Sequence, residues 1–514
     1  MNEVNRVAKN TGILYARMGI TVFISLYSTR LILNALGVSD FGLFNVVGGA
    51  IAMLTFLNNA MAGATQRFMS YAQGEGNFEK QKNIFNVSTI IHFVIGILIV
   101  LVLEVAGYFF FGGILKIPSD RIYVAKLIYQ FMLASTFFSI ISVPYDAVIN
   151  AHENMLLVAI LGILEAIFKL GIAIFVTYTL MDRLITYGVL MVALSICLLV
   201  IRRIYCHRKY LEVEINIRKF YNKTLFKEMT SFAGWSLIGT TTSVLASYGQ
   251  GIVLNVFFGT IVNAAQGIAS QVSGQLSVFA GTMLKALNPM IDKSEGAGNR
   301  LMLLKASMIG SKTSFFLLMF TFIPVLVEMP YIFGIWLKDI PEFTIVFCRL
   351  LLLRNLVEQL YATLTSTIAA VGNIRKFTIV VSFFYFMPIV VSYFIFKLNY
   401  PAYSLYVVFL IFSMLTFFVV LYFSKINCGI SVSEFMKNVV LRSISSFIIV
   451  FCFSIIPTFF LPSGFMRLSL VVFIAVCAFI VVIWFVGFNA EERYGIKAMK
   501  EGIVEKLKGK LKLM

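Results

Sequence analysis

Nine charged side chains lie deep inside long apolar stretches of this sequence, where a charge costs at least about 2.5–3.5 kcal/mol near the bilayer centre. The six basic ones are Arg17, Arg30, Lys169, Lys312, Arg349 and Arg354, and the three acidic ones are Glu104, Glu165 and Glu358. A guanidinium can contact a diphosphate through two parallel hydrogen bonds, whereas a cation exporter needs free carboxylates in its cavity. The basic excess therefore favours an anionic ligand.

Some of these charges can neutralise each other on their own helices. Glu165 and Lys169 are four residues apart and would share one helix face. The same holds for Arg354 and Glu358. Lys312 has no such neighbour, so we expect it to bond to the helix over 342–370 or to backbone carbonyl groups.

Arg17 and Arg30 share the first apolar segment with no acidic neighbour, and amides gather in three other segments. These amides are Asn58 and Asn59, Gln250 and Asn255, and Asn263, Gln266, Gln271 and Gln275. Buried amides without partners cost several kcal/mol, so they must face water, a ligand or each other. One interpretation is the lining of a substrate cavity. The alternatives are hydrogen bonds between helices for the amides and snorkelling to the membrane surface for the two arginines.

The elements that position these residues are membrane-spanning helices. Of 514 residues, 60% are apolar and 13% are charged, against about 45–50% and about 25% in soluble domains. This composition excludes a soluble enzyme and predicts an all-α polytopic membrane protein with about 14 transmembrane helices. We expect spans over 11–36, 42–66, 86–112, 122–144, 155–180, 184–204, 230–257, 261–287, 302–326, 342–370, 376–397, 402–423, 437–459 and 468–488.

The loop charges agree with this count. With the N-terminus in the cytoplasm, 28 Lys and Arg residues fall in cytoplasmic segments and seven in outer ones. Most of the net charge of +18 therefore marks the cytoplasmic face, and we expect both termini there and no nucleic-acid partner. Six scattered cysteines and three histidines indicate neither disulfides nor a metal site.

An internal repeat divides the chain. Gly37 and the motif Gly74-Glu75-Gly76-Asn77 recur 222 residues later as Gly259 and Gly296-Ala297-Gly298-Asn299. Six helices separate the copies, and an even number preserves orientation, so we expect two six-helix bundles related by a pseudo-two-fold along the membrane normal. The expected organisation is an N-terminal lobe (1–205), a basic connector (206–229), a C-terminal lobe (230–424), helices 13 and 14 (425–490) and a basic tail (491–514).

No sequence feature indicates catalysis or a cofactor. Gly310-Ser311-Lys312-Thr313 lacks the glycine that a phosphate-binding loop needs before lysine, so ATP hydrolysis is not expected. A membrane-embedded glycosyltransferase or ligase would need larger outer loops than the sequence provides. We therefore predict a protein that is not an enzyme.

Several motifs resemble Wzx-type polysaccharide flippases of the multidrug/oligosaccharidyl-lipid/polysaccharide exporter (MOP) superfamily. They are FAGW (232–235), QGIVLNVFFG (250–259), VNAAQGIA (262–269), ALNPMIDKS (286–294), LGVSDFG (36–42) and Gln66-Arg67. The resemblance implies two lobes of a multidrug and toxic compound extrusion (MATE)-like fold. It further implies a cavity lined by helices 1, 2, 7 and 8, with Arg17 or Arg30 contacting the substrate.

The function implied by this resemblance is flipping of undecaprenyl-diphosphate-linked oligosaccharide units from the inner to the outer leaflet, for O-antigen or capsule synthesis. The implied location is the bacterial cytoplasmic membrane, where the partners would be membrane lipids, the lipid-linked substrate, and a polysaccharide polymerase with chain-length proteins. The leading alternative is a MATE-like cation-coupled drug exporter, which should carry free carboxylates in its cavity.

Overall fold

The computed structural model describes residues 3–52, 55–111, 119–337 and 340–494, without the side chains of 45–60 and of some further residues near the N-terminus. Residue contacts divide the chain into two compact units. The amino-terminal unit comprises Ala8–Thr241 and Asn288–Asn299, and the carboxy-terminal unit comprises Met1–Val7, Thr242–Leu287 and Arg300–Met514. No β-strand occurs in the described part of the chain.

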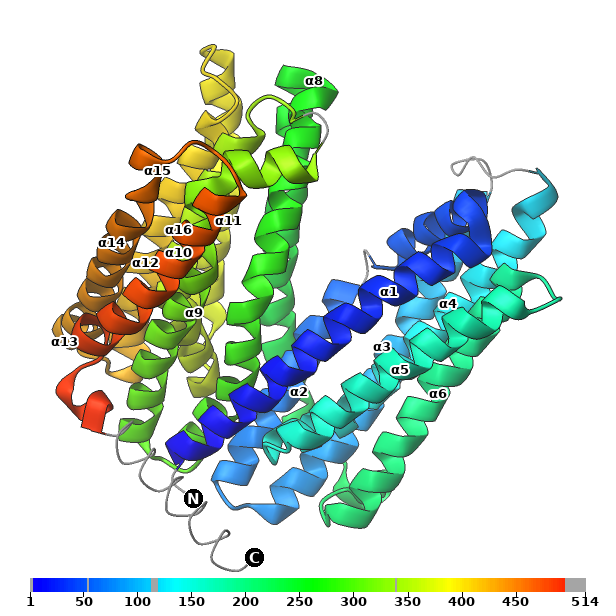
Figure 1. Cartoon of the computed structure of the whole chain (residues 1–514). Helices are drawn as coiled ribbons and strands as arrows, with labels where there is room; N and C mark the ends of the chain where they lie inside the picture. Colours follow the sequence, from blue (N-terminus) through cyan, green and yellow to red (C-terminus); the bar gives the residue numbers. More distant parts are fainter. Residues whose placement is uncertain (1–2, 53–54, 112–118, 338–339, 495–514) are drawn as a thin grey trace, which may run out of the picture. The chain divides into compact units, whose positions relative to one another are not determined.

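The amino-terminal unit is a helical bundle centred on α4. Its elements are α1 (Glu3–Ala52), α2 (Thr55–Gly74), α3 (Phe78–Phe109), η2 (Ser119–Arg121), α4 (Ile122–Ala151), α5 (Met155–Tyr178), α6 (Arg183–Lys209), α7 (Ile217–Phe220) and the start of α8 (Lys223–Gly296). α4 packs against α2, α3 and α6, and Figure 1 shows α3, α4, α5 and α6 running alongside one another. The side chains of Ile128 and Tyr129 on α4 are fully buried in this bundle.

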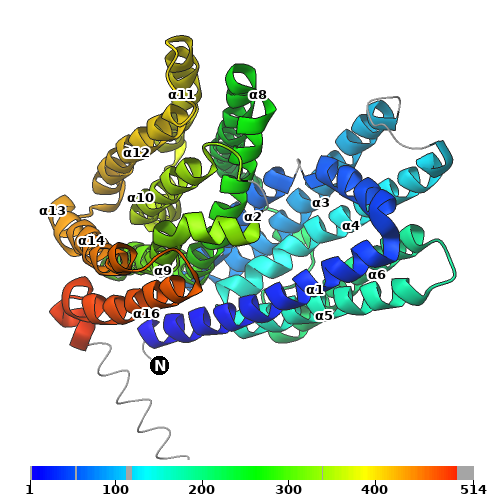
Figure 2. The same cartoon turned by 45° about the horizontal axis from the view of Figure 1, so that its top comes forward.

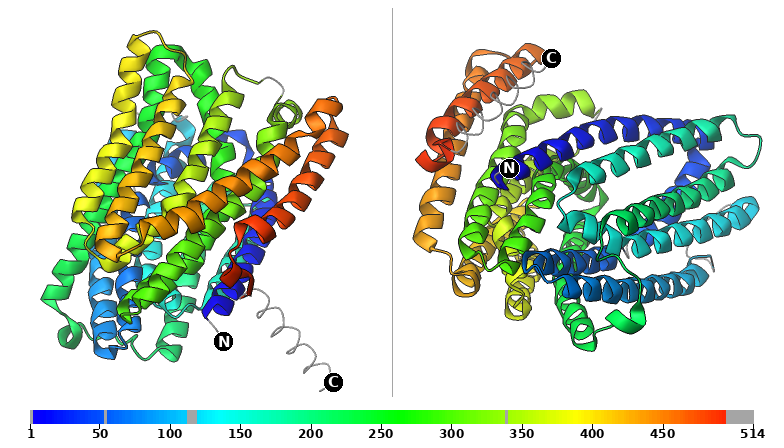
Figure 3. Two further views of the ribbon diagram at one scale, coloured as in Figure 1. Left: turned by 90° about the vertical axis from the view of Figure 1, so that its left-hand side faces the viewer. Right: turned by 90° about the horizontal axis from the view of Figure 1, so that it is seen from below.

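The carboxy-terminal unit contains the rest of α8 and the helices that follow. They are α9 (Arg300–Trp336), α10 (Thr344–Val371), α11 (Arg375–Lys397), α12 (Ser404–Cys428), α13 (Val432–Phe435), η3 (Met436–Leu441), α14 (Arg442–Ile455), α15 (Pro457–Phe460), α16 (Phe465–Val482) and η4 (Ile483–Gly487). α10 packs against α9 and α12, while α14 and α16 form a hairpin at the end of the chain (Figure 2). This hairpin lies against α9 (Figure 3).

The expectation of an all-α polytopic protein is confirmed. Ten segments of the described chain are long and apolar enough to span a membrane. The four expected spans missing from these ten are 42–66, the two arms of α8, and α10. They carry the amides and the Arg354–Glu358 pair, so their composition falls short for the same reason that drew attention to them.

The repeat is confirmed in the backbone. α1 is interrupted at Gly37 (φ 75°, ψ 168°), and α8 is interrupted at Gly259 (φ 77°, ψ −168°). Gly76 and Gly298 also share a positive φ, 69° and 68°. Each pair is 222 residues apart. A positive φ is accessible to glycine without the penalty that a Cβ would add, so both copies use glycine at the same two turns.

The repeated glycines before these turns meet each other within the amino-terminal unit. A Cβ on Gly74 would lie 2.0 Å from the carbonyl oxygen of Lys293, and one on Gly296 would lie 1.9 Å from that of Tyr71. Lys293 is the repeat equivalent of Tyr71, so the contact is reciprocal. The ends of α2 and α8 therefore touch backbone to backbone, and only glycine fits at either position.

Candidate functional site

The structure pairs most of the intramembrane charges that the sequence singled out. Glu165 Oε1 accepts from Lys169 Nζ at 2.7 Å, and Arg354 Nε donates to Glu358 Oε1 at 2.8 Å. Both i, i+4 pairs are as expected. These four groups therefore contribute no net charge.

The expected partner of Lys312 was wrong. Its Nζ donates to Glu492 Oε2 at 2.5 Å, and its side chain is only 2% exposed. Glu492 follows η4, and contact between the final hairpin and α9 brings it to Lys312. A partner 180 residues away carries no local sequence signal.

Three arginines remain without an ion pair or hydrogen bond among the described residues: Arg17, Arg30 and Arg349. Arg17 lies over Gly162 of α5, where a Cβ would come within 2.2 Å of its Nε. Arg30 is exposed on α1. Thirteen residues separate the two on one helix, which places them about 20 Å apart and about 140° apart around its axis. They therefore cannot grip one diphosphate together.

The sequence analysis missed two acidic groups because it ended their helices too early. α4 continues to Ala151 instead of ending at 144, and its Asp146 Oδ1 lies 2.8 Å from Arg202 Nε. α9 continues to Trp336 instead of ending at 326, and its fully buried Glu328 pairs with Arg467. Both groups have basic partners. Among the acidic groups of the described spans, Glu104 alone has a neutral partner, Gln130.

The expected amide candidates occupy different environments. Gln250 and Gln266 are buried, and Asn263 is half-buried. Asn263 and Gln266 both face Gly251 across the turn in α8, and the Gln266 Oε1 atom has no donor among the described residues. Thus the two arms of α8 bring these amides together. Three others are exposed: Asn255, Gln271 and Gln275. Asn58 and Asn59 lie on α2, but their side chains are outside the described residues.

A small polar cavity surrounds the Arg354–Glu358 pair inside the carboxy-terminal unit. Ser243 of α8, Tyr385 of α11 and Ser413 of α12 help to line it. Its volume is about 70 Å³, which suits a few water molecules rather than a sugar. We therefore do not place the substrate in this cavity.

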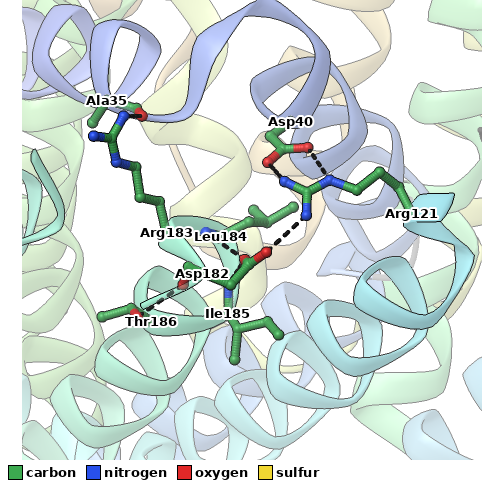
Figure 4. A network of polar contacts seen from close by, with 8 residues as sticks. All are labelled: Ala35, Asp40, Arg121, Asp182, Arg183, Leu184, Ile185 and Thr186. Carbon is green, nitrogen blue, oxygen red and sulfur yellow. Dashed lines mark hydrogen bonds and ion pairs between the residues drawn. The ribbon is translucent and has the colours of Figure 1, made fainter. Parts of the chain in front are cut away.

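A second polar network joins helix ends in the amino-terminal unit (Figure 4). Arg121 bonds to both Asp40 and Asp182, while Arg183 Nη1 donates to the Ala35 carbonyl at 2.9 Å. The bonds to Asp40 and Asp182 raise the pKa of Arg121. Burial opposes ionisation of Asp182, but backbone N–H groups and Arg121 outweigh it and lower the pKa of that carboxyl. Asp40 of the LGVSDFG motif thus anchors α1 to α4 and α6.

Three other motifs come together where α2 and α8 end. The Arg67 guanidinium lies 5.2 Å from the Phe232 ring centre, and Lys293 Nζ lies 3.2 Å from Glu153 Oε1. Burial raises the pKa of Asp292 to about 7, against the opposing effect of Arg67. Arg67, Phe232 and Asp292 belong to separate stretches of the sequence, yet they form one cluster beside the glycine contact.

Comparisons with known proteins identify the fold. No protein-family model and no curated protein sequence matches the chain. A MOP superfamily transporter from Pyrococcus furiosus is similar in structure, with a TM-score of 0.70 at 14% identity, over 84% of this chain and 96% of that one. A multidrug resistance MATE family transporter in an outward-facing conformation has a TM-score of 0.70 at 14% identity, over 82% of this chain and 95% of that one. The chain has the fold of MATE transporters of the MOP superfamily.

Proposed function

We propose that this membrane transporter moves an anionic lipid-linked sugar, namely an undecaprenyl-diphosphate-linked oligosaccharide, from the inner to the outer leaflet of the bacterial cytoplasmic membrane. The observation that carries the proposal is the charge left after pairing. Arg17, Arg30 and Arg349 have no acidic partner among the described residues, whereas nearly every intramembrane carboxylate there has a basic one. A cavity with spare guanidinium groups suits phosphate oxygens.

In the proposed mechanism, arginines of α1 contact the diphosphate and amides of α2 and α8 bond to the sugar. The lipid tail remains in the bilayer. An inside-negative potential favours outward movement of anions by about 2.3 kcal/mol per charge per 100 mV, so no coupled ion is required. We expect the polysaccharide polymerase and chain-length proteins to act on the exported unit.

The second candidate is a cation-coupled drug exporter, which is supported by the MATE transporters among the structural neighbours. Such an exporter needs a carboxylate that binds and releases protons or cations. Against it, Glu165 and Glu358 are held by Lys169 and Arg354. The Pyrococcus furiosus neighbour is described as having a binding pocket of reversed polarity and a different function, which supports a similar divergence here.

A flipping assay separates the two candidates. Purified protein in vesicles is given a fluorescent, short-chain isoprenyl-diphosphate-linked sugar, and dithionite reports the fraction in the accessible leaflet. We expect Arg17→Ala and Arg30→Ala each to slow flipping and the double variant to abolish it. Lys126→Ala, which removes an exposed charge from α4, should flip at the wild-type rate. Normal flipping by the double variant would refute the proposal, and proton-dependent drug efflux without flipping would establish the exporter.

A further inference from the structure

An apolar groove lies inside the carboxy-terminal unit, between α9, α10 and the final hairpin. Its volume is about 550 Å³, and its walls include Leu353 of α10 and Phe447, Phe451 and Ile455 of α14. Pockets of about 300–1,000 Å³ are typical of small-molecule sites. The groove is thus large enough for part of a lipid, and its apolar walls disfavour a water-soluble ligand.

Two arginines line this groove, and they differ in their partners. Arg467 Nε and Nη2 donate to the two carboxylate oxygens of Glu328 at 2.8 and 2.9 Å, so its charge is compensated. Arg349 has no ion pair or hydrogen bond in the described part of the chain. One net positive charge therefore stands beside an apolar cavity.

The groove lies near the ends of its helices. Arg349 is the sixth residue of α10 and Arg467 the third of α16, which places both within about 8 Å of a helix start. That depth corresponds to the boundary between lipid headgroups and acyl chains. The loop charges assign this end of the helices to the outer leaflet.

We propose that the groove binds one anionic phospholipid of the membrane, with its phosphate on Arg349 and an acyl chain between α10 and α14. A phosphodiester carries one negative charge, which matches the one uncompensated guanidinium. The guanidinium can donate to two phosphate oxygens at once. This site is separate from the transported substrate, so the proposal holds whichever lipid or drug the protein moves.

Tryptophan quenching by brominated lipids tests the site. The reporter is Phe451→Trp in a chain whose native tryptophans, Trp235, Trp336 and Trp484, are replaced by phenylalanine. Phosphatidylglycerol and phosphatidylcholine with brominated acyl chains are titrated into the detergent-solubilised protein. We expect phosphatidylglycerol to quench the reporter at a concentration about tenfold lower or less, since a hydrogen bond to a charged group is worth that much.

Variants of the arginine identify the phosphate contact. Arg349→Gln should remove the preference for phosphatidylglycerol, and Arg349→Lys should restore part of it. The matched control is Lys397→Gln, which removes an exposed charge at the same end of α11 and should keep the preference. Equal quenching by the two lipids in the reporter protein, which needs no change at Arg349, would overturn the proposal. Stronger binding of undecaprenyl phosphate than of phosphatidylglycerol would also overturn it and assign the groove to the substrate.

Discussion

Replacing Gly74 with alanine tests the reciprocal contact between the ends of α2 and α8. The new Cβ would lie 2.0 Å from the carbonyl oxygen of Lys293 and 2.9 Å from the amide nitrogen of Ala297, whereas real Cβ contacts essentially never fall below 3.0 Å. Both neighbours are backbone atoms, so the helix ends must separate by about 1 Å or more. Overpacking of this kind costs about 1–3 kcal/mol, which lowers the population of the contact by about 5-fold to 150-fold.

A zero-length cross-link measures that population. Glu153 Oε1 and Lys293 Nζ lie 3.2 Å apart, so an apolar carbodiimide should join them as an amide that mass spectrometry can quantify. We expect Gly74→Ala to lose most of this cross-link. Gly63→Ala is the matched control on α2, because its Cβ would meet nothing within 4 Å and alanine favours the helix.

The repeat supplies a second arm of the same experiment. Gly296→Ala places its Cβ 1.9 Å from the Tyr71 carbonyl oxygen and should lose the cross-link as Gly74→Ala does. Gly281→Ala on α8, with nothing within 4 Å, should keep it. A wild-type yield in either of the two contact variants would refute the steric argument.

Three further substitutions test individual groups. Because the folded-state pKa of Asp292 is raised to about 7, its ionisation lowers stability as pH rises from about 4 to 7; Asp292→Asn should raise the melting temperature at pH 8 and flatten this pH profile, and an unchanged profile would contradict the burial. Glu492→Gln should leave the Lys312 ammonium buried without its charge partner and cost about 3–5 kcal/mol, seen as a lower melting temperature that Lys312→Met added to it recovers. Gly162→Ala should displace the Arg17 side chain and slow flipping as much as Arg17→Ala, with the melting temperature kept because a flexible side chain can move away; unaltered flipping would show that the position of Arg17 is unimportant.

The fold was predictable because its signals are local. Long apolar segments specify spans, and paired glycines with positive φ specify the repeat, so both were visible in the sequence. Contacts between distant helices were not. The Lys312–Glu492 pair depends on how the final hairpin packs against α9, and no residue spacing encodes that packing.

Errors in helix ends had chemical consequences. The expected end at 326 left Glu328 outside its helix, and the structure shows it fully buried and paired with Arg467. Hydropathy marks where apolar residues stop, but a helix can continue through a charged residue that has a partner. Charges near expected helix ends are therefore the ones that sequence reasoning assigns least well.

Pairing could have erased the basic excess on which the anionic ligand depends, and it did not. The two additional acidic groups, Asp146 and Glu328, arrive with their own basic partners and cancel no arginine. What the structure changes is how the excess can act. Arg17 and Arg30 point about 140° apart on α1, so one diphosphate meets them at different positions or different times. If both are needed for flipping, each single substitution should impair a different step, and neither arginine should compensate for the other.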